Sequence, residues 1–505
     1  MSDHLFDDVV IGSGPTGWAA CMGIWARGGK PLVIDIGYTA SNCSADSVIR
    51  NPIVKSKSRF GSEHMYAYPL KNLGISLPDG VVPLSGALGG LSTVWGAGIQ
   101  PVSKADLTDV PYSVGQEWLN SSAELLQKMD FLGRNDLLSQ RDPWPHEPHD
   151  HVVTSSRFEK VLRRADSKKS IERLEVLFGS PRLAITGSRN KEMDNACTLC
   201  GQCMSGCPED SIFDSGLKIQ TGLSQHGGWY LNRVVTELSG DTNPGEPSSR
   251  NVLIKVLDSD GTTEIIRSKR LFLAAGAIGT PVLLQRSGYA PEILDVRDSQ
   301  MFYSAFISID KYDETLPSMS TSQGYFSTSS EVNLQDEFSL SVYEYSDDFR
   351  DRLEQLVPKI IKPVIGLFKP LTQRIVPGIG FLAQDVSGLL RLKWDGEKTS
   401  ITLVKGSSTK NAIRSARRKL RRTSIKIGLI PLPNPFKDPA VGAGFHAGSS
   451  MPMGNTSQNL VDWTGSLKSL PAVRIVDTTC LPRIKAGSHT FMAMANAYRI
   501  ANRNE

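Results

Sequence analysis

At 505 residues the chain is too long for one ordinary hydrophobic core, so two or more domains are expected. Its apolar content of 40% and charged content of 21% are typical of a globular protein, and its net charge is only +4. No apolar stretch reaches the roughly 18 residues that span a bilayer, and the polar, acidic N-terminus leaves no room for a secretion signal. The seven cysteines are not spread as a disulfide framework would be. A soluble protein of a reducing cytoplasm is therefore expected.

The chain opens on a strand, a glycine-rich turn and a helix. Residues 7–11 read as a buried parallel strand, and Gly-Ser-Gly-Pro-Thr-Gly follows at once. In such a fingerprint the first glycine makes the turn, the second admits a pyrophosphate, and the third lets helix and strand pack closely. A second strand, 31–35, ends in an acid placed to accept hydrogen bonds from an unphosphorylated ribose, which favours FAD or NAD over NADP. The predicted cofactor residues here are Gly12, Gly14, Pro15, Thr16, Gly17 and Asp35.

A second glycine-rich loop, residues 86–98, can run along the pyrophosphate and ring of a flavin. Residues 270–281 form a strand that enters another glycine-rich turn, the usual return of a chain to a flavin domain. Each pattern alone is more often a simple turn. In this order, after a complete fingerprint, they favour FAD over NAD. The candidate flavin contacts in these stretches are Gly89, Gly90, Ser92, Trp95, Ala275 and Gly276.

Between them, four cysteines fall within eleven residues as Cys-x-x-Cys-x-x-Cys-x-x-x-Cys-Pro. This spacing lets one loop present several thiolates to an iron–sulfur cluster. Zinc is disfavoured, because its two Cys-x-x-Cys pairs are normally separated by about a dozen residues or more. Bare structural thiols are the alternative. We predict a 4Fe–4S cluster, in preference to a 3Fe–4S form, with metal ligands Cys197, Cys200, Cys203 and Cys207.

The positive charge is concentrated in one segment. Residues 355–429 carry 16 Lys and Arg against 3 acids, a local charge of +13, so the rest of the chain sums to −9. Basic residues interleaved with apolar ones can hold phosphorylated substrates or lie against an anionic membrane. A solvated helix face beside an ordinary apolar loop is the alternative. Peripheral membrane contact through 356–430 is kept as a hypothesis, and nucleic acid is not expected because no nucleic-acid-binding signature accompanies the charge.

Three C-terminal motifs follow: FHAGSSMPMG at 445–454, VRIVDTTCLP at 473–482 and AGSHT at 486–490. Together with the N-terminal motifs they resemble the glucose–methanol–choline (GMC) oxidoreductases. The resemblance runs from about residue 7 to the end of the chain and is weakest from about 290 to 435. It implies that Asp477 and Thr490 contribute to FAD binding, that the loop around Gly89 and Trp95 lies by the flavin, and that Val235 contacts the adenine.

The resemblance also implies a catalytic pair, His446 and His489. Oxidising an alcohol requires removal of the hydroxyl proton and delivery of a hydride to flavin N5, and an imidazole can take that proton. A second imidazole can orient the hydroxyl and stabilise alkoxide character. By analogy with the family, His446 is assigned as the base of the pair. The sequence departs from the family where Ser488–His489 replaces the usual Asn–Pro, and no histidine is suitably placed to tether FAD covalently (His64 is the nearest), so FAD is expected to be non-covalent.

The expected function is an FAD-dependent dehydrogenase of a sugar or sugar-like alcohol, including sugar nucleotides. Electrons would leave through the cluster to an external protein, quinone or haem acceptor. One alternative is a flavin alcohol oxidase whose cysteine loop is structural. Another is an electron-transfer flavoprotein without an alcohol substrate, against which the histidine pair argues.

The expected fold class is α/β, with a Rossmann-type FAD-binding domain and a mixed α+β substrate domain. The FAD-binding domain would comprise 1–290 together with 440–505, with the cysteine loop 195–210 inserted. Residues 291–439 would form the substrate domain, and 116–189 are a candidate bridge between the two.

Overall fold

The computed structural model describes most of the chain. The described residues are 4–37, 74–76, 82–167, 172, 174–187, 195–203, 207–241, 251–312, 317–328, 334–345, 373–433 and 437–503. Cys43, His64 and the apolar–basic stretch 356–369 lie outside them.

A mixed sheet built around parallel strands holds the first glycine-rich turn. β1 (Leu5–Ile11) lies at its centre and pairs in parallel with β2 (Leu32–Asp35) and β8 (Thr263–Leu273). The strand order is β18–β19–β8–β1–β2–β5, and the β6–β7 hairpin joins it by pairing β7 with β8. The remaining strands are β5 (Trp229–Asn232), β6 (Val234–Gly240), β7 (Val252–Leu257), β18 (Ser466–Leu467) and β19 (Leu470–Ile475). The expected parallel sheet around the fingerprint is therefore present.

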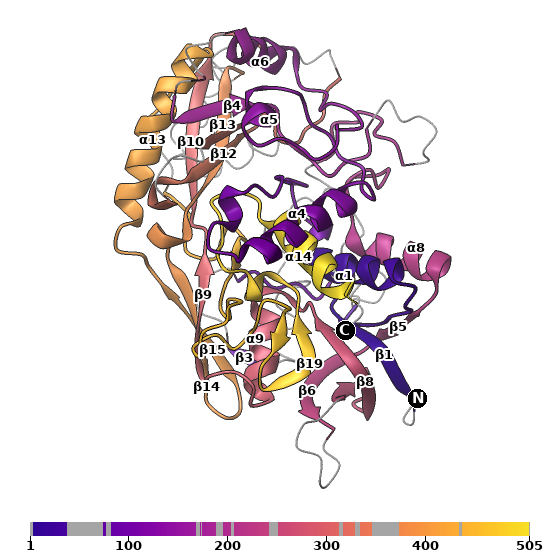
Figure 1. Ribbon diagram of the computed structural model, residues 1–505. Coiled ribbons are helices and arrows are strands. Elements are labelled where there is room, and N and C mark those ends of the chain that lie inside the picture. Colours follow the sequence, from indigo (N-terminus) through magenta and orange to yellow (C-terminus); the bar gives the residue numbers. More distant parts are fainter. Residues whose placement is uncertain are drawn as a thin grey trace.

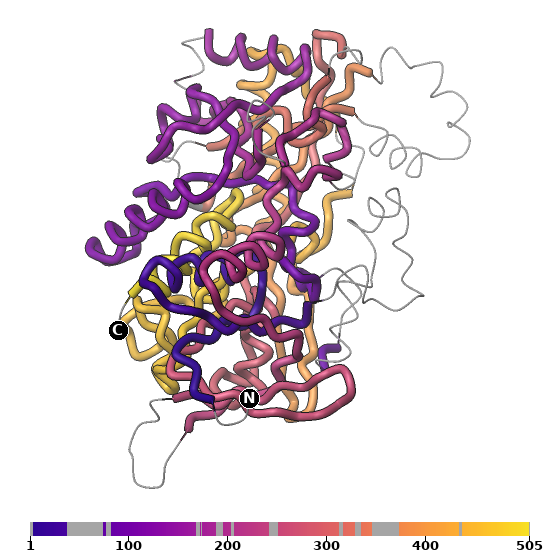
Figure 2. The backbone as a smooth tube through the Cα atoms, turned by 90° about the vertical axis from the view of Figure 1, so that its right-hand side faces the viewer, coloured from indigo at the N-terminus to yellow at the C-terminus, as the bar shows by residue number. Residues whose placement is uncertain are grey.

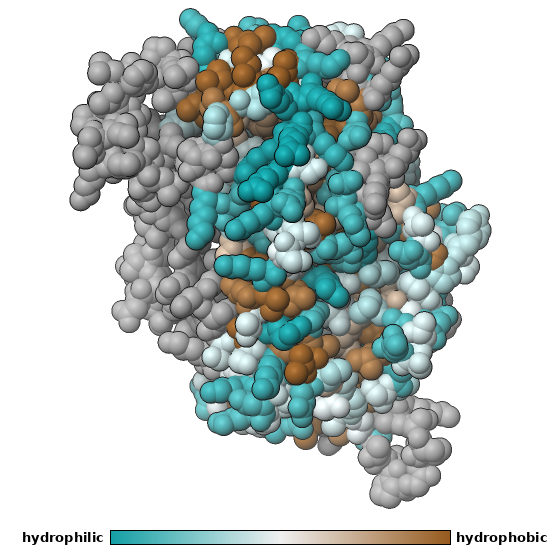
Figure 3. Space-filling model, turned by 90° about the vertical axis from the view of Figure 1, so that its left-hand side faces the viewer, coloured by the Kyte–Doolittle hydropathy of each residue, from teal (hydrophilic) through white to brown (hydrophobic). Residues whose placement is uncertain are grey.

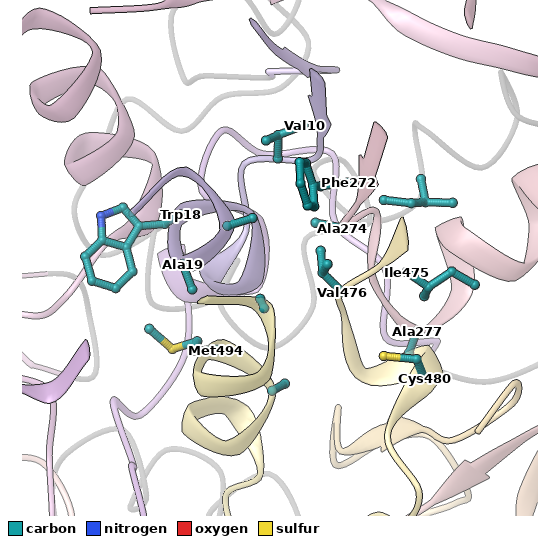
Figure 4. Close-up of a cluster of buried hydrophobic side chains, with 14 of the residues drawn as sticks. Val10, Trp18, Ala19, Phe272, Ala274, Ala277, Ile475, Val476, Cys480 and Met494 are labelled. Carbon is teal, nitrogen blue, oxygen red and sulfur yellow. The ribbon is translucent and has the colours of Figure 1, made fainter. Parts of the chain in front are cut away.

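The first and last helices pack against each other beside this sheet. α1 (Pro15–Ala26) follows the glycine turn, and α14 (Thr490–Ala501) lies along it, so segments from both ends of the chain are adjacent (Figures 1 and 2). Figure 4 shows Trp18 and Ala19 of α1 beside Met494 of α14, with Val10, Phe272 and Val476 on the strand side. Because these side chains are almost fully excluded from water, they belong to one large core. The other helices that pack within this part are α4 (Tyr112–Leu126), α8 (Ser215–His226) and α9 (Gly276–Arg286).

A second, antiparallel sheet of six strands in the described residues has its own core. Its order is β16–β10–β13–β12–β11–β4, and one of its faces is covered by α13 (Thr409–Lys426) and α6 (Ser156–Ser167). Side chains alternate along β13, with Val376 and Leu382 buried and Phe381 half-exposed on the opposite face. The strands are β4 (Val176–Gly179), β10 (Met301–Ser308), β11 (Gly324–Thr328), β12 (Phe338–Val342), β13 (Ile375–Leu382) and β16 (Leu429–Pro431).

A third sheet links the other two. Its order is β17–β9–β14–β15–β3, and Val296, Leu390 and Leu392 bury its inner face in the core of the first sheet. Its strands are β3 (Ile75–Ser76), β9 (Ile293–Asp298), β14 (Leu389–Trp394), β15 (Thr399–Val404) and β17 (Ala447–Gly448). The short elements are α5 (Leu137–Arg141), η1 (Gly90–Thr93), η2 (Ala105–Leu107), η3 (Leu334–Asp336), η5 (Gln384–Val386) and η6 (Thr478–Cys480).

Each of the two hydrophobic cores is built from segments that are not contiguous in the sequence. β9, β14 and β15 come from the stretch 291–439 but pack with the first core, whereas β4 and α6 from 116–189 pack with the second. The division at 290 and 440 therefore stays a prediction. Among the described helices, none is both long and apolar enough to cross a membrane.

The close contact of α1 with α14 predicts a strict size limit at Gly23. A Cβ at Gly23 would lie 2.8 Å from the Tyr498 carbonyl oxygen and 2.9 Å from the Asn502 nitrogen, so Gly23→Ala must push the helices apart. We expect a loss of about 1–3 kcal/mol in the free energy of unfolding, measured by chemical denaturation. Gly115→Ala in α4 is the control. Its Cβ would find Leu107 at 3.9 Å, so it should be neutral or stabilising by up to about 1 kcal/mol. Equal stability of the two variants would contradict the packing argument.

Candidate active site

The glycine turn after β1 combines two crowded positions with one open one. At Gly12, which has φ +103°, a Cβ would lie 2.3 Å from the Ala274 carbonyl oxygen. At Gly17 it would lie 2.0 Å from the Gly12 carbonyl oxygen, so both positions need glycine for backbone packing. At Gly14 an added Cβ meets no described atom within 4 Å. Gly14 therefore borders open space at the N-terminus of α1, where Pro15 and Thr16 begin the helix.

Asp35 ends β2 beside this turn. Its Oδ2 accepts from the Ser13 N–H at 2.7 Å, and its Oδ1 accepts from the Gly37 N–H at 2.6 Å. Burial raises the pKa of the carboxyl to about 6, against the lowering effect of these hydrogen bonds. The carboxyl thus lies at the carboxyl end of a parallel strand, the usual place for a ribose-binding acid.

The loop that contains Gly89 and Gly90 closes over the turn. The Gly89 N–H donates to Ser13 Oγ at 2.8 Å, and a Cβ at Gly90 would lie 3.2 Å from the Gly14 Cα. Ser92 Oγ lies 2.9 Å from Ser215 Oγ, and Ser215 Oγ in turn donates to the Ser13 carbonyl oxygen. Ser215 was missed in the sequence. The signal for it was the Asp214 N-cap that begins α8, directly after the cysteine run.

Trp95 and Val235 occupy less central positions. The Trp95 indole N–H donates to the Phe213 carbonyl at 2.9 Å, and its ring meets the Phe213 ring edge-on at 6.0 Å between centroids. Val235 lies on β6 and is 8% exposed. Their proposed contacts with flavin and adenine stay predictions.

Asp477 supports a backbone turn. Its Oδ1 accepts from the Thr479 N–H at 2.9 Å, while its Oδ2 accepts from the Gly276 N–H at 2.8 Å and from the Thr280 hydroxyl. It is 2% exposed, and burial raises the pKa of its carboxyl. Both oxygens are thus engaged by protein donors, and they fix the N-terminus of α9, where Ala275 is the cap. Gly276, at φ +83°, borders open space as Gly14 does.

The two predicted histidines come together from distant parts of the chain. His446 directly precedes β17, and His489 is the N-cap of α14, next to Thr490. Their rings meet edge-on at 5.1 Å between centroids, and His446 stacks on Phe381 of β13 at 4.0 Å. The Nδ1 atoms of both histidines are buried and have no hydrogen-bond partner among the described residues. Among the described residues this is the one ring contact between two histidines.

Both imidazoles are held in the neutral form. Burial lowers the pKa of His446 to about 4. Burial, the neighbouring His446 and the cation of Lys485 together lower the pKa of His489 well below its usual value. Neutral imidazoles can accept a proton at physiological pH, which a base in this position must do.

His446 is held in place by a strained backbone at the preceding residue and by a nearby buried acid. Phe445, directly before it, has φ +56°, which is uncommon for a bulky residue. The Ser299 N–H donates to the His446 carbonyl at 2.8 Å, and Asp298 Oδ2 accepts from the Gly442 N–H at 2.9 Å. Asp298 is fully buried, its Oδ1 has no partner among the described residues, and burial raises its pKa to about 7.

A cavity of about 120 Å³ lies beside the segment that leads to His489. Gly487, Tyr325, Ser327 and Ser339 line it, and Arg141 Nη2 donates to Ser327 Oγ at 3.0 Å. In the six-stranded sheet Ser327 pairs with Ser339, and Ser339 pairs with Phe381. These three side chains therefore share one face of the sheet, about 5 Å from strand to strand. The cavity wall and the ring beneath His446 belong to that same face.

The cysteine run does not form a metal site in the described residues. Cys203 is buried, Cys200 is exposed, and the other two are half-buried. Burial raises the pKa of the Cys197 and Cys203 thiols, which disfavours thiolates. No group of three or more His, Cys, Asp or Glu side chains within the described ranges could hold a metal ion. The predicted iron–sulfur cluster is therefore not supported.

Comparisons with known proteins bear on the fold. No family model matches the chain, and no curated protein matches its sequence. Among solved structures, pyridoxine 4-oxidase from Mesorbium loti is similar over 99% of both chains, with a TM-score of 0.59 and 14% sequence identity. The predicted fold class is confirmed: the chain is α/β, with a Rossmann-type sheet built around parallel strands, and it shares the fold of this oxidase. At this identity the similarity shows the fold alone.

The raised pKa of Asp298 predicts a pH-dependent effect on stability. The Asp298 carboxyl loses its proton near pH 4 in the unfolded chain and near pH 7 in the folded protein. Its contribution to the free energy of unfolding is therefore smallest above pH 7. Relative to wild type, Asp298→Asn should therefore gain stability between pH 4 and pH 8, by up to about 4 kcal/mol. Denaturation curves at both pH values measure the gain. Asp395→Asn is the control: hydrogen bonds lower the pKa of that exposed carboxyl, so its effect should run in the opposite direction. A pH-independent difference for Asp298→Asn would contradict the assignment.

Proposed function

We propose that this chain is an FAD-dependent GMC-type oxidoreductase that oxidises the CH–OH group of an alcohol. The observation that carries the proposal is the pair His446 and His489: two imidazoles with lowered pKa values, whose rings meet edge-on and whose Nδ1 atoms have no hydrogen-bond partner among the described residues. A structural role alone would satisfy those nitrogens, since buried polar atoms are normally hydrogen-bonded.

The residues around the glycine turn fit FAD. Gly14 and Gly276 both border open space that a Cβ would enter, and Asp35 lies at the strand end where a ribose-binding acid is expected. The loop of Gly89 and Gly90 lies against the same turn: the Gly89 N–H donates to Ser13 Oγ, and a Cβ at Gly90 would lie 3.2 Å from the Gly14 Cα. When bound there, FAD would supply the hydride acceptor. Non-covalent binding is proposed, because no histidine of the described glycine loop is placed to tether it.

The protein's own groups would handle the proton. His446, neutral and stacked on Phe381, would accept the hydroxyl proton of the substrate. His489 would hold the same oxygen by a hydrogen bond and stabilise alkoxide character. The α14 N-terminus, capped by His489, adds a positive dipole end that favours negative charge there.

The cavity favours a polyhydroxylated substrate. Its wall carries the hydroxyls of Tyr325, Ser327 and Ser339, and burial raises the pKa of Tyr325 to about 12, so its hydroxyl keeps its proton. Charged neighbours such as Lys485 and Asp106 are paired at 3.1 Å. A cavity wall with several hydroxyl groups that can hydrogen-bond, and with charged side chains that are paired with each other, suits a sugar or sugar-like alcohol.

On the question of where the electrons go, we favour the first alternative to the dehydrogenase, a flavin alcohol oxidase whose cysteine loop is structural. The absence of a metal-binding group among the described cysteines and the oxidase name of the structural neighbour both support it. Molecular oxygen is thus the first acceptor to test, and an external protein, quinone or haem acceptor the next. The histidine pair disfavours an electron-transfer flavoprotein without an alcohol substrate.

Cofactor content tests the FAD proposal. Gly14→Val should stay folded, because its Cβ meets open space, but should lose FAD because the pyrophosphate can no longer approach the backbone. Asp35→Ala should lower FAD content through the missing ribose contact. Absorbance of purified protein and of the supernatant after denaturation measures both content and covalency. Wild-type FAD levels in both variants would reject this binding site.

Flavin reduction tests the histidine pair. With FAD bound, His446→Ala and His489→Ala should each slow reduction by an alcohol substrate by about 10² or more. The double variant should be little worse than the worse single one, because both groups act on one proton transfer. His226→Ala, an exposed histidine at the end of α8, is the matched control. Free sugars, sugar nucleotides and pyridoxine are the substrates to screen. A double variant that reduces its flavin at the wild-type rate would remove the proposed function.

A further inference from the structure

Helix α13 presents a basic outer face. Its 18 residues include eight Lys or Arg and no Asp or Glu. Ile413, Ala416 and Leu420 turn inward and are buried in the core of the six-stranded sheet. The helix is therefore held by its apolar stripe, and its charges are left on the outside.

Most of these charges are not neutralised by the protein. Arg417 pairs with Asp438, and Lys419 pairs with Glu175 and Asp336. The remaining exposed cations make no ion pair within the part of the chain that the structure describes. They are Lys410, Arg414, Arg418, Arg421 and Arg422. Four of the five are spaced by four residues, so they form a row along roughly 18 Å of helix.

An exposed apolar cluster lies at the C-terminal end of this row. Ile309, Ile425 and Ile430 are 52%, 49% and 48% exposed. The Ile309 N–H donates to the Gly428 carbonyl, and a Cβ at Gly428 would meet the Ile309 side chain at 2.8 Å, so Ile309 lies beside the turn between Ile425 of α13 and Ile430 of β16. Figure 3 shows this side of the molecule, with a band of hydrophilic side chains on its upper half and hydrophobic ones at the top.

We propose that this face, the basic row of α13 together with Ile309, Ile425 and Ile430, docks the protein on an anionic membrane surface. Each Lys or Arg near such a surface adds about 1 kcal/mol of attraction, and exposed isoleucines can enter the headgroup boundary. The solvated-face alternative explains the cations but not an apolar cluster at their end. Phe381, on which His446 stacks, lies on the opposite face of the six-stranded sheet, so docking through α13 does not cover it.

Vesicle binding of the full-length protein tests the proposal. Wild type should sediment with vesicles of phosphatidylcholine mixed with phosphatidylglycerol, but not with phosphatidylcholine alone, and salt should weaken the binding. The triple variant Arg418→Glu, Arg421→Glu, Arg422→Glu should bind about 100-fold more weakly. The control triple Lys393→Glu, Lys398→Glu, Lys468→Glu changes net charge equally at other exposed sites and should bind as wild type does.

A second variant addresses the apolar cluster. Ile425→Ser with Ile430→Ser should keep binding at low salt and lose the part that survives high salt, since the cations still attract the protein. Failure of wild type to bind anionic vesicles, or equal weakening by both charge-reversal triples, would overturn the proposal. Retention on polyglutamate without vesicle binding would also overturn it and assign the face to an acidic protein.

Discussion

The first and last helices of the chain pack with their backbones almost in contact, and the position of the candidate site depends on that contact. Gly23 allows α1 to approach the Tyr498 carbonyl of α14, and Trp18 and Met494 fill the space beside it. α1 begins at the glycine turn, and α14 begins at His489. The contact therefore sets the distance between the proposed pyrophosphate site and the proposed acid–base group, although they lie more than 470 residues apart in sequence.

Burial then decides the chemistry of the side chains brought together. It lowers the pKa of His446 and His489, so both stay neutral, and it raises the pKa of Asp35, Asp298 and Asp477. Asp477 shows the consequence most clearly. The resemblance to GMC oxidoreductases suggested a cofactor ligand, whereas its two oxygens are engaged by Thr479, Gly276 and Thr280 and hold the start of α9. Its contribution to FAD binding stays a prediction.

The cysteine run shows that the spacing of cysteines in a sequence does not by itself establish a metal site. A short run of cysteines constrains only how close the thiols can come, and cluster binding also needs the sulfurs to converge. In the described loop Cys200 is exposed while Cys203 is buried, and no group of ligands could hold a metal. Ser13 lies inside the glycine fingerprint and Ser215 follows the Asp214 N-cap, but neither position showed that they would tie the glycine loop to the turn, because their backbone partners are far away in sequence.

The sequence by itself determined the strand, turn and helix at the start of the chain, the acid at the end of β2 and the α/β fold class, because these follow from local periodicity and from glycines that backbone contacts require. It also predicted that His446 and His489 form a pair, through motifs that resemble a family. Only the tertiary structure decided that their rings meet, that the cavity shares a sheet face with Phe381, and that β9, β14 and β15 belong to the first core. Those outcomes depend on contacts between residues hundreds of positions apart, and no local pattern encodes the distance between two side chains.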